Sequence, residues 1–99
     1  MYWNNVTSTS PHAMKFYYVY VLRNLTKEFV YVGFTSDLRK RFNKHNNREV
    51  LSTKHYAPHE LIHYEAYKNI NDAKRREKYF KTTKGKTVLK LMLKEFLSH

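Results

Sequence analysis

The chain has 99 residues and a mass of 12.1 kDa, which is the length of one small domain, and a composition of 41% apolar and 27% charged residues is not that of a disordered chain. It contains no cysteine, which excludes disulfide scaffolds, thiolate zinc sites and cysteine nucleophiles and is typical of a reducing, cytoplasmic compartment. No apolar run approaches the roughly 20 residues of a membrane span, so neither secretion nor membrane insertion is expected.

The net charge is the most informative property of the composition. Nineteen Lys and Arg residues against eight Asp and Glu give +11. Because each neutralised phosphate releases a counterion, such a domain is expected to bind a polyanion, usually nucleic acid. A basic but merely solvated surface, as in ribosome-associated proteins, is the alternative.

The first third of the chain predicts a tail followed by a hairpin. Residues 1–14 lack hydrophobic periodicity and are rich in Asn, Ser and Thr, so we expect a flexible tail before a single domain over residues 15–99. Residues 16–22 and 28–34 are dense in aromatic and β-branched side chains. They predict two strands of an antiparallel hairpin.

The rest of the chain predicts one more strand and three helices. The resulting order is β-β-α-β-α-α. The expected elements are a helix capped by Thr35 or Ser36 and running to about Asn46, a strand over residues 61–67, a helix from a cap at Asn71 or Asp72 to about Gly85, and a last helix over residues 86–97.

Two tyrosines of the hairpin are candidate site residues. If the turn is centred between Leu25 and Thr26, Tyr20 stands opposite Tyr31. Two facing phenols beside Gly33 could form a polar platform that a ligand backbone approaches closely. The alternative is a cross-strand aromatic pair that stabilises the hairpin by roughly 0.2–1 kcal/mol.

The first helix places two basic residues beside its apolar side chains. Leu38, Arg41, Phe42 and His45 stand at i, i+3, i+4 and i+7, which is one helix face. Arg41 and His45 are therefore expected to border the core. A buried guanidinium needs a carboxylate or a phosphate as its partner, unless its charged end reaches water from the edge of the core.

The second helix contains one inward-facing acid. Glu77 shares the expected inward stripe with Ile70, Ala73 and Phe80. Two explanations remain open: ligation of a hard cation, or a salt bridge to Arg41. A site with one carboxylate, waters and phosphate oxygens suits Mg²⁺. The basic residues around it are candidates for backbone contacts with nucleic acid, or else a solvated helix face: Lys74, Arg75, Lys78 and Lys81.

Other familiar sites are not expected. His55, His59 and His63 are spaced by four, but Pro58 lies among them and forbids a helical register, so a zinc site is not predicted. The only glycines are Gly33 and Gly85, which excludes a phosphate-binding glycine loop of the P-loop or Rossmann kind.

Taken together, the pattern resembles the GIY-YIG nuclease domain over residues 15–97. Tyr18-Val19-Tyr20 and Tyr31-Val32-Gly33 stand at the two tripeptides, and Arg41, His45 and Glu77 follow in the family's order. The likeness is closest to small stand-alone members related to the N-terminal domain of excinuclease C, a DNA repair protein. It implies an α+β fold with a three-stranded antiparallel sheet flanked by helices.

The resemblance also implies a chemistry. The family hydrolyses phosphodiesters with one divalent cation, so Glu77 would hold one Mg²⁺ or Mn²⁺ ion and Arg41 would neutralise charge on the phosphorane. Tyr31 would orient or deprotonate the attacking water, helped by Tyr20 and His45. The expected function is a Mg²⁺-dependent DNA endonuclease or nicking nuclease, with RNA not excluded as a substrate.

Two other functions fit the charge. One is a nucleic-acid-binding module on the same fold with weak or no catalysis. The other is an RNA- or ribosome-associated structural protein in which Glu77 is only an ion-pair partner.

Overall fold

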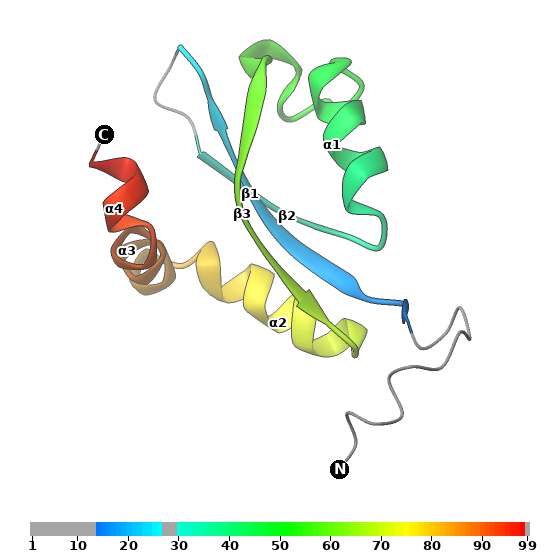
Figure 1. Cartoon of the computed structure of the whole chain (residues 1–99), viewed down its shortest axis with the longest axis vertical. Helices are drawn as coiled ribbons and strands as arrows, with labels where there is room; N and C mark the ends of the chain where they lie inside the picture. Colours follow the sequence, from blue (N-terminus) through cyan, green and yellow to red (C-terminus); the bar gives the residue numbers. More distant parts are fainter. Residues whose placement is uncertain (1–13, 27–29, 99) are drawn as a thin grey trace.

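The computed structural model describes residues 14–26 and 30–98, so all but the last residue of the predicted tail lies outside the described part of the chain. A three-stranded antiparallel sheet in the order β2-β1-β3 forms its centre. The strands are β1 (Tyr17–Asn24), β2 (Val30–Thr35) and β3 (His59–Tyr67), and the helices are α1 (Leu38–Asn46), α2 (Ile70–Phe80), α3 (Thr83–Met92) and a short α4 (Lys94–Leu97). The predicted α+β fold and its β-β-α-β-α-α order are confirmed (Figure 1).

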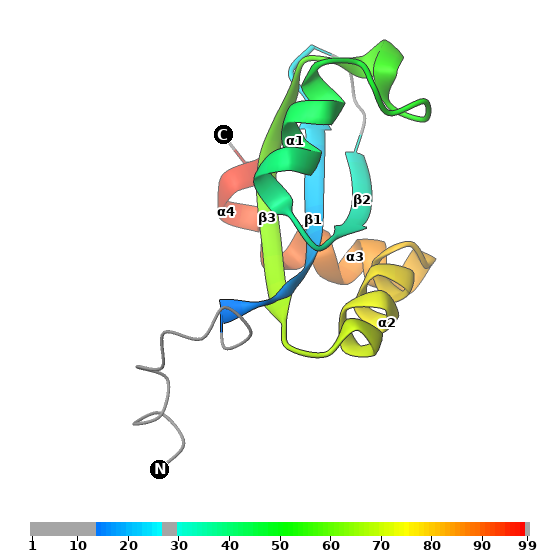
Figure 2. The ribbon, with the colours of Figure 1, turned by 90° about the vertical axis from the view of Figure 1, so that its right-hand side faces the viewer.

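Helices cover both faces of the sheet, with α1 on one side and α3 and α4 on the other (Figure 2). The central strand β1 is therefore buried throughout Val19–Leu22, because both of its faces are covered. Val19 and Val21 pack with Ala73, Phe80 and Leu89 of α2 and α3. Tyr20 and Leu22 point to the opposite face, where α1 lies, since side chains alternate along a strand. This run of buried residues therefore contributes side chains to the packing on both faces of the sheet.

The hairpin register differs from the predicted one. Tyr20 pairs with Gly33, and Tyr31 pairs with Leu22, so the predicted Tyr20–Tyr31 pairing was wrong by two residues. A shift of two keeps every side chain on its face, because the period of a strand is two. Tyr20 and Tyr31 are therefore diagonal neighbours on one face, with ring centroids 6.2 Å apart.

The helix boundaries also differ from the predicted ones, because other side chains cap them. Asp37, not Thr35 or Ser36, caps α1 by accepting a hydrogen bond from the backbone N–H of Lys40 at 3.1 Å. Asn69, not Asn71 or Asp72, caps α2. Thr82 caps α3, so the predicted helix to Gly85 is divided into α2 and α3. Gly85 lies in the first turn of α3, where a Cβ would collide with the backbone of Tyr79.

The connection between α1 and β3 is folded onto the α1 face. Val50 and Thr53 are buried in it, and a 3₁₀ turn (Lys54–Tyr56) follows. Arg48, at φ 63°, donates hydrogen bonds to the carbonyl oxygens of Lys54 and Ala57. These contacts hold Thr53 beneath the C-terminal end of α1. Within residues 14–26 and 30–98, no helix is long and apolar enough to cross a membrane.

Candidate active site

Tyr20 is the centre of a polar cluster between β1, β2 and α1. Its hydroxyl lies 2.7 Å from Nε2 of His45 and accepts a hydrogen bond from Nε of Arg41 at 3.4 Å. Tyr31 completes the group, with its ring centroid 5.1 Å from that of His45. The structure therefore brings together four of the five predicted catalytic residues: Tyr20, Tyr31, Arg41 and His45.

Gly33 makes room for this cluster. It stands directly across from Tyr20 in the sheet, and a Cβ there would collide with the Tyr20 ring and hydroxyl. The expected close approach of a ligand backbone at Gly33 is not what the structure shows, because the Tyr20 side chain fills that space. The glycine is needed to seat the tyrosine.

Burial sets the protonation states of the two central groups. Tyr20 is 1% exposed, and desolvation raises its pKa to about 12 in spite of the hydrogen bond from Arg41. His45 is fully buried; desolvation, followed by the positive charge of Arg41, lowers its pKa to about 4. At neutral pH both side chains are therefore uncharged.

Arg41 supplies the positive charge of the cluster. Its hydrogen bond with Tyr20 raises the pKa of the guanidinium, which stays protonated. Among the described residues no acid pairs with Arg41, so the predicted alternative of a salt bridge with Glu77 was wrong. Arg41 is only half-buried, and its remaining N–H groups can meet an incoming anion.

The carboxylate of Glu77 pairs with Lys81, the residue that follows the C-terminal end of α2, at 3.0 Å. Its side chain is 23% exposed, and the predicted inward stripe holds for Ala73 and Phe80 but not for Ile70, which is 37% exposed. A groove with a volume of about 1280 Å³ lies between the sheet and helices α3 and α4; Tyr31 and Lys81 are among its lining residues, whereas Tyr20, Arg41, His45 and Glu77 do not line it. No contact joins Glu77 directly to the other four residues in the described structure.

Around Glu77 the described residues offer a metal ion few protein ligands. A positive charge already lies on its carboxylate, and the described residues contain no cluster of three or more His, Asp or Glu side chains that could enclose a metal. A divalent ion there would complete its coordination with water and phosphate oxygens, which is how Mg²⁺ is commonly bound.

Some of the basic side chains in and next to α2 that were predicted to contact nucleic acid are already paired within the protein. Arg75 pairs with Asp72 at 2.7 Å and Lys81 with Glu77, while the Lys74 ammonium lies 5.5 Å from the centre of the Phe34 ring. Lys78 is exposed on the same helix.

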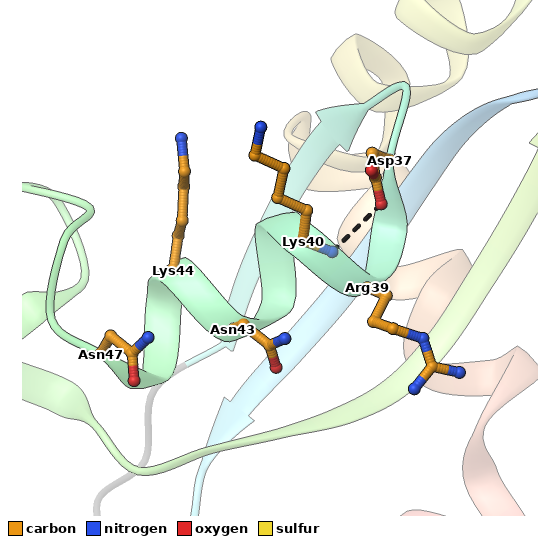
Figure 3. Close-up of a pocket in the computed structure, with 6 residues that line it drawn as sticks. All are labelled: Asp37, Arg39, Lys40, Asn43, Lys44 and Asn47. Atoms are coloured by element: carbon orange, nitrogen blue, oxygen red, sulfur yellow. Dashed lines mark hydrogen bonds between the residues drawn. The ribbon is translucent and has the colours of Figure 1, made fainter.

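The outer surface of α1 carries basic side chains that were not predicted from the sequence as binding residues. A shallow pocket of about 400 Å³ is lined there by Asp37, Arg39, Lys40, Asn43, Lys44 and Asn47. Lys40 and Lys44 extend from the same side of the helix (Figure 3). Within the described part of the chain no acid pairs with Arg39, Lys40 or Lys44, and the carboxylate of Asp37 is used to cap the helix. The i, i+4 spacing of Lys40 and Lys44 was the available signal.

A second polar cluster, which was not predicted from the sequence, lies on the opposite face of the sheet. Glu65 receives two hydrogen bonds from Arg76, at 2.8 and 3.3 Å, and others from Tyr67 at 2.6 Å and His63 at 3.0 Å. Burial alone would raise the pKa of Glu65, but these donors lower it to about 2. The alternation of His63, Glu65 and Tyr67 along one strand face was the signal for it.

Comparison with known proteins agrees with this arrangement. Residues 16–90 match the model of the GIY-YIG catalytic domain. A UPF0213 protein of Clostridium perfringens is 37% identical over 65 residues, which is 65% of this chain and 69% of that protein. UPF0213 proteins of Streptococcus pyogenes are 34% identical over 71 residues, or 71% of this chain and 76% of theirs.

No solved structure matches the chain significantly. The matched segment begins before the first tyrosine tripeptide, ends within α3, and includes all the residues of the tyrosine cluster and Glu77. The chain belongs to the GIY-YIG family, whose domains are nuclease domains that act on DNA.

Proposed function

We propose that this protein is a divalent-metal-dependent DNA endonuclease or nicking nuclease. The observation that supports this most is the cluster of Tyr20, Tyr31, Arg41 and His45, in which one permanent cation has no acid partner among the described residues and lies beside two phenols and a neutral imidazole. A structural cluster would be expected to compensate its charge internally, as Glu65 and Arg76 do. A guanidinium without an acid partner, placed beside groups that can carry a proton, can stabilise the negative charge that develops on a phosphodiester in the transition state of its hydrolysis.

Each residue of the cluster has a role that follows from its position. Arg41 offers donors to the non-bridging phosphate oxygens, where negative charge grows during hydrolysis. Tyr31 is half-buried and lines the groove, so it is the phenol that can orient a water molecule or take its proton. Tyr20 and His45 are buried behind it and assist that proton transfer through their 2.7 Å contact.

Glu77 is the residue that would hold the metal. One Mg²⁺ or Mn²⁺ ion bound there would stabilise negative charge on the phosphate and on the leaving 3′ oxygen. Because Lys81 pairs with the same carboxylate, its ammonium must release Glu77 when the ion binds.

The substrate backbone is best placed along the outer surface of α1. Arg39, Lys40 and Lys44 carry charges that no acid of the described chain neutralises, and the same helix carries Arg41 on its inner side. Phosphates on this surface would therefore be close to the helix that positions the catalytic guanidinium. The cations of α2 are the second choice, because two of them are already paired.

Incubation of the protein with supercoiled plasmid, a branched DNA and a single-stranded RNA, with and without Mg²⁺, tests the proposal. Metal-dependent nicking or cutting of DNA is expected, abolished by Arg41→Ala and restored by adding the wild-type protein. Binding without cleavage of any substrate would instead identify a nucleic-acid-binding module. Cleavage that persists in a chelator would contradict the role of Glu77.

A further inference from the structure

Thr53 lies in the connection between α1 and β3, outside the family's motif residues, and it contacts the buried side of His45. Its side chain is fully buried. The hydroxyl Oγ1 is 2.7 Å from Nδ1 of His45 and 3.5 Å from the carbonyl oxygen of Val50. His45 therefore has a hydroxyl on each ring nitrogen, Thr53 on Nδ1 and Tyr20 on Nε2.

These contacts form one chain of hydrogen bonds with dissimilar ends. At one end the Arg41 guanidinium has only N–H donors, and at the other the Val50 carbonyl can only accept. Between them lie the hydroxyl of Tyr20, the ring of His45 and the hydroxyl of Thr53, each of which can donate in either direction. A neutral imidazole carries its proton on one nitrogen, so the direction of the whole chain decides its tautomer.

We propose that Thr53 is a positioning residue that fixes His45 in the tautomer with the proton on Nδ1. In this arrangement Arg41 donates to Tyr20, Tyr20 donates to Nε2 of His45, Nδ1–H donates to Thr53, and Thr53 donates to the Val50 carbonyl. Every proton of the chain then has an acceptor. In a neutral imidazole Nδ1 is the less common site of protonation, and here Thr53 of the loop, not the helix that carries His45, selects it.

The acidities of the groups favour this direction over the reverse. A phenol is a far stronger acid than an aliphatic hydroxyl, and an imidazole nitrogen is the most basic acceptor in the chain, so the phenol is the better donor to the ring. The Arg41 cation on the Tyr20 oxygen strengthens that phenol further as a donor. In the reverse direction Thr53 would donate to His45, His45 to Tyr20, and Tyr20 to Tyr31.

The catalytic consequence rests on the proposed function. The rings of Tyr31 and Tyr20 are neighbours, with centroids 6.2 Å apart. With the direction given above, Tyr20 donates its own proton to Nε2 of His45 and has none to donate to Tyr31. The Tyr31 oxygen is then free to accept a hydrogen bond from the attacking water, and neither Tyr20 nor His45 changes its charge. In the reverse direction Tyr20 donates to Tyr31, and that donation occupies the Tyr31 oxygen.

The tautomer is measured directly on the free full-length protein, without any activity. A long-range ¹H–¹⁵N correlation spectrum near neutral pH distinguishes protonated from unprotonated ring nitrogens, and the His45 signals are assigned from the spectrum of His45→Asn. We expect a protonated Nδ1 and an unprotonated Nε2 in the wild type and in Thr53→Ser, which keeps the hydroxyl. Thr53→Val keeps the shape and removes the acceptor, so its Nδ1–H preference should be lost.

Kinetics give the second measurement. For Thr53→Val we expect kcat for DNA cleavage to fall at least tenfold with KM unchanged, and Thr53→Ser to restore kcat. Thr87→Val, which removes an exposed hydroxyl on α3, is the matched control and should leave both unchanged. If Thr53→Val does not fold, the wild-type spectrum and the Thr53→Ser variant carry the test.

The outcomes separate this inference from the proposed function. A wild-type His45 protonated on Nε2, or a Thr53→Val variant with an unaltered tautomer, would overturn the role of Thr53 even if the protein cuts DNA. The expected tautomer and its loss in Thr53→Val, in a protein that cleaves no DNA, would uphold the positioning role and refute the nuclease proposal.

Discussion

The two faces of the sheet carry one polar cluster each, and the clusters differ in how their charge is compensated. Beneath α2, the carboxylate of Glu65 and the guanidinium of Arg76 neutralise each other, and Tyr67 and His63 satisfy the remaining acceptor positions. Beneath α1, the groups around Tyr20 are uncharged except Arg41, whose charge no acid of the described chain compensates.

This difference separates a structural role from a chemical one. A closed ion pair has no net charge with which to attract a substrate anion, and it lowers the free energy of the folded state only while both partners are present. An open guanidinium beside neutral proton carriers is ready for an anion, but it contributes little to folding. We therefore expect substitutions beneath α1 to reduce activity and substitutions beneath α2 to reduce stability.

The largest expected effect is on cleavage by Glu77→Gln, which removes the negative charge and keeps the side-chain volume. Without that charge the metal is not held, and cleavage should fall by about three orders of magnitude or more, measured as the initial rate of plasmid nicking. DNA binding should persist or tighten. The melting temperature should hardly move, because the lost pair with Lys81 is solvent-exposed.

Glu95→Gln, which removes the same charge from the exposed surface of α4, is the matched control. If Glu77→Gln lowers the melting temperature and leaves metal-dependent cleavage intact, Glu77 is a structural residue.

Tyr31→Phe tests the α1 side of the comparison with the smallest chemical change. Loss of the hydroxyl should slow cleavage by about two orders of magnitude, because a positioned proton acceptor contributes roughly 10²- to 10⁴-fold. The dissociation constant for DNA and the melting temperature should stay at the wild-type values. Tyr64→Phe, on an exposed tyrosine of β3, should leave the rate unchanged. An equal loss in both variants would remove Tyr31 from the site.

Glu65→Gln should show the opposite pattern. It leaves Arg76 without a carboxylate in a half-buried place, so we expect the free energy of unfolding to fall by roughly 2–3 kcal/mol and the melting temperature by about 10 °C or more. The cleavage rate of the folded variant should equal that of the wild type at a temperature where both are folded. A loss of rate without a loss of stability would show that the two faces are coupled.

The same carboxylate predicts a pH dependence of stability. Its pKa in the folded state is about 2, well below the ordinary value of 4.5, so its contribution is complete above pH 4.5 and is lost as the pH falls towards 2. That contribution is on the order of 3 kcal/mol at about 1.4 kcal/mol per pKa unit. Denaturant unfolding at pH 6, 4 and 2.5 should show this loss in the wild type, and a smaller one in Glu65→Gln.

The smallest expected effect concerns the cations on the outside of α1. Lys40→Ala with Lys44→Ala should weaken DNA binding about tenfold near physiological salt and reduce the slope of log affinity against log salt by about two. Arg75→Ala with Lys81→Ala removes the same two charges from α2 and should have the smaller effect, because those side chains are already paired. Fluorescence anisotropy in a chelator measures both. The reverse ranking would place the substrate on α2.

Much of the fold could be predicted because it depends on local patterns. The aromatic and β-branched runs gave the first two strands, and helical spacing placed Arg41 and His45 on one face, as observed. The caps were misplaced by one to three residues, because Asp37 and Asn69 had competing neighbours that can also cap a helix. The sequence also predicted an inward-facing acid at Glu77, with a cation or Arg41 as its partner, whereas the observed partner is Lys81, four residues later.

What the sequence by itself determined is the order of the elements, the face on which each strand side chain lies, and the set of residues that marks the family. These follow from periods of two and 3.6 residues, which are local properties of the backbone. Only the tertiary structure decided that Tyr20 lies over Gly33, that Thr53 contacts His45, and that Glu65 pairs with Arg76. Each of these contacts joins residues from different elements, and it depends on hairpin register and on the path of a loop that no local period encodes.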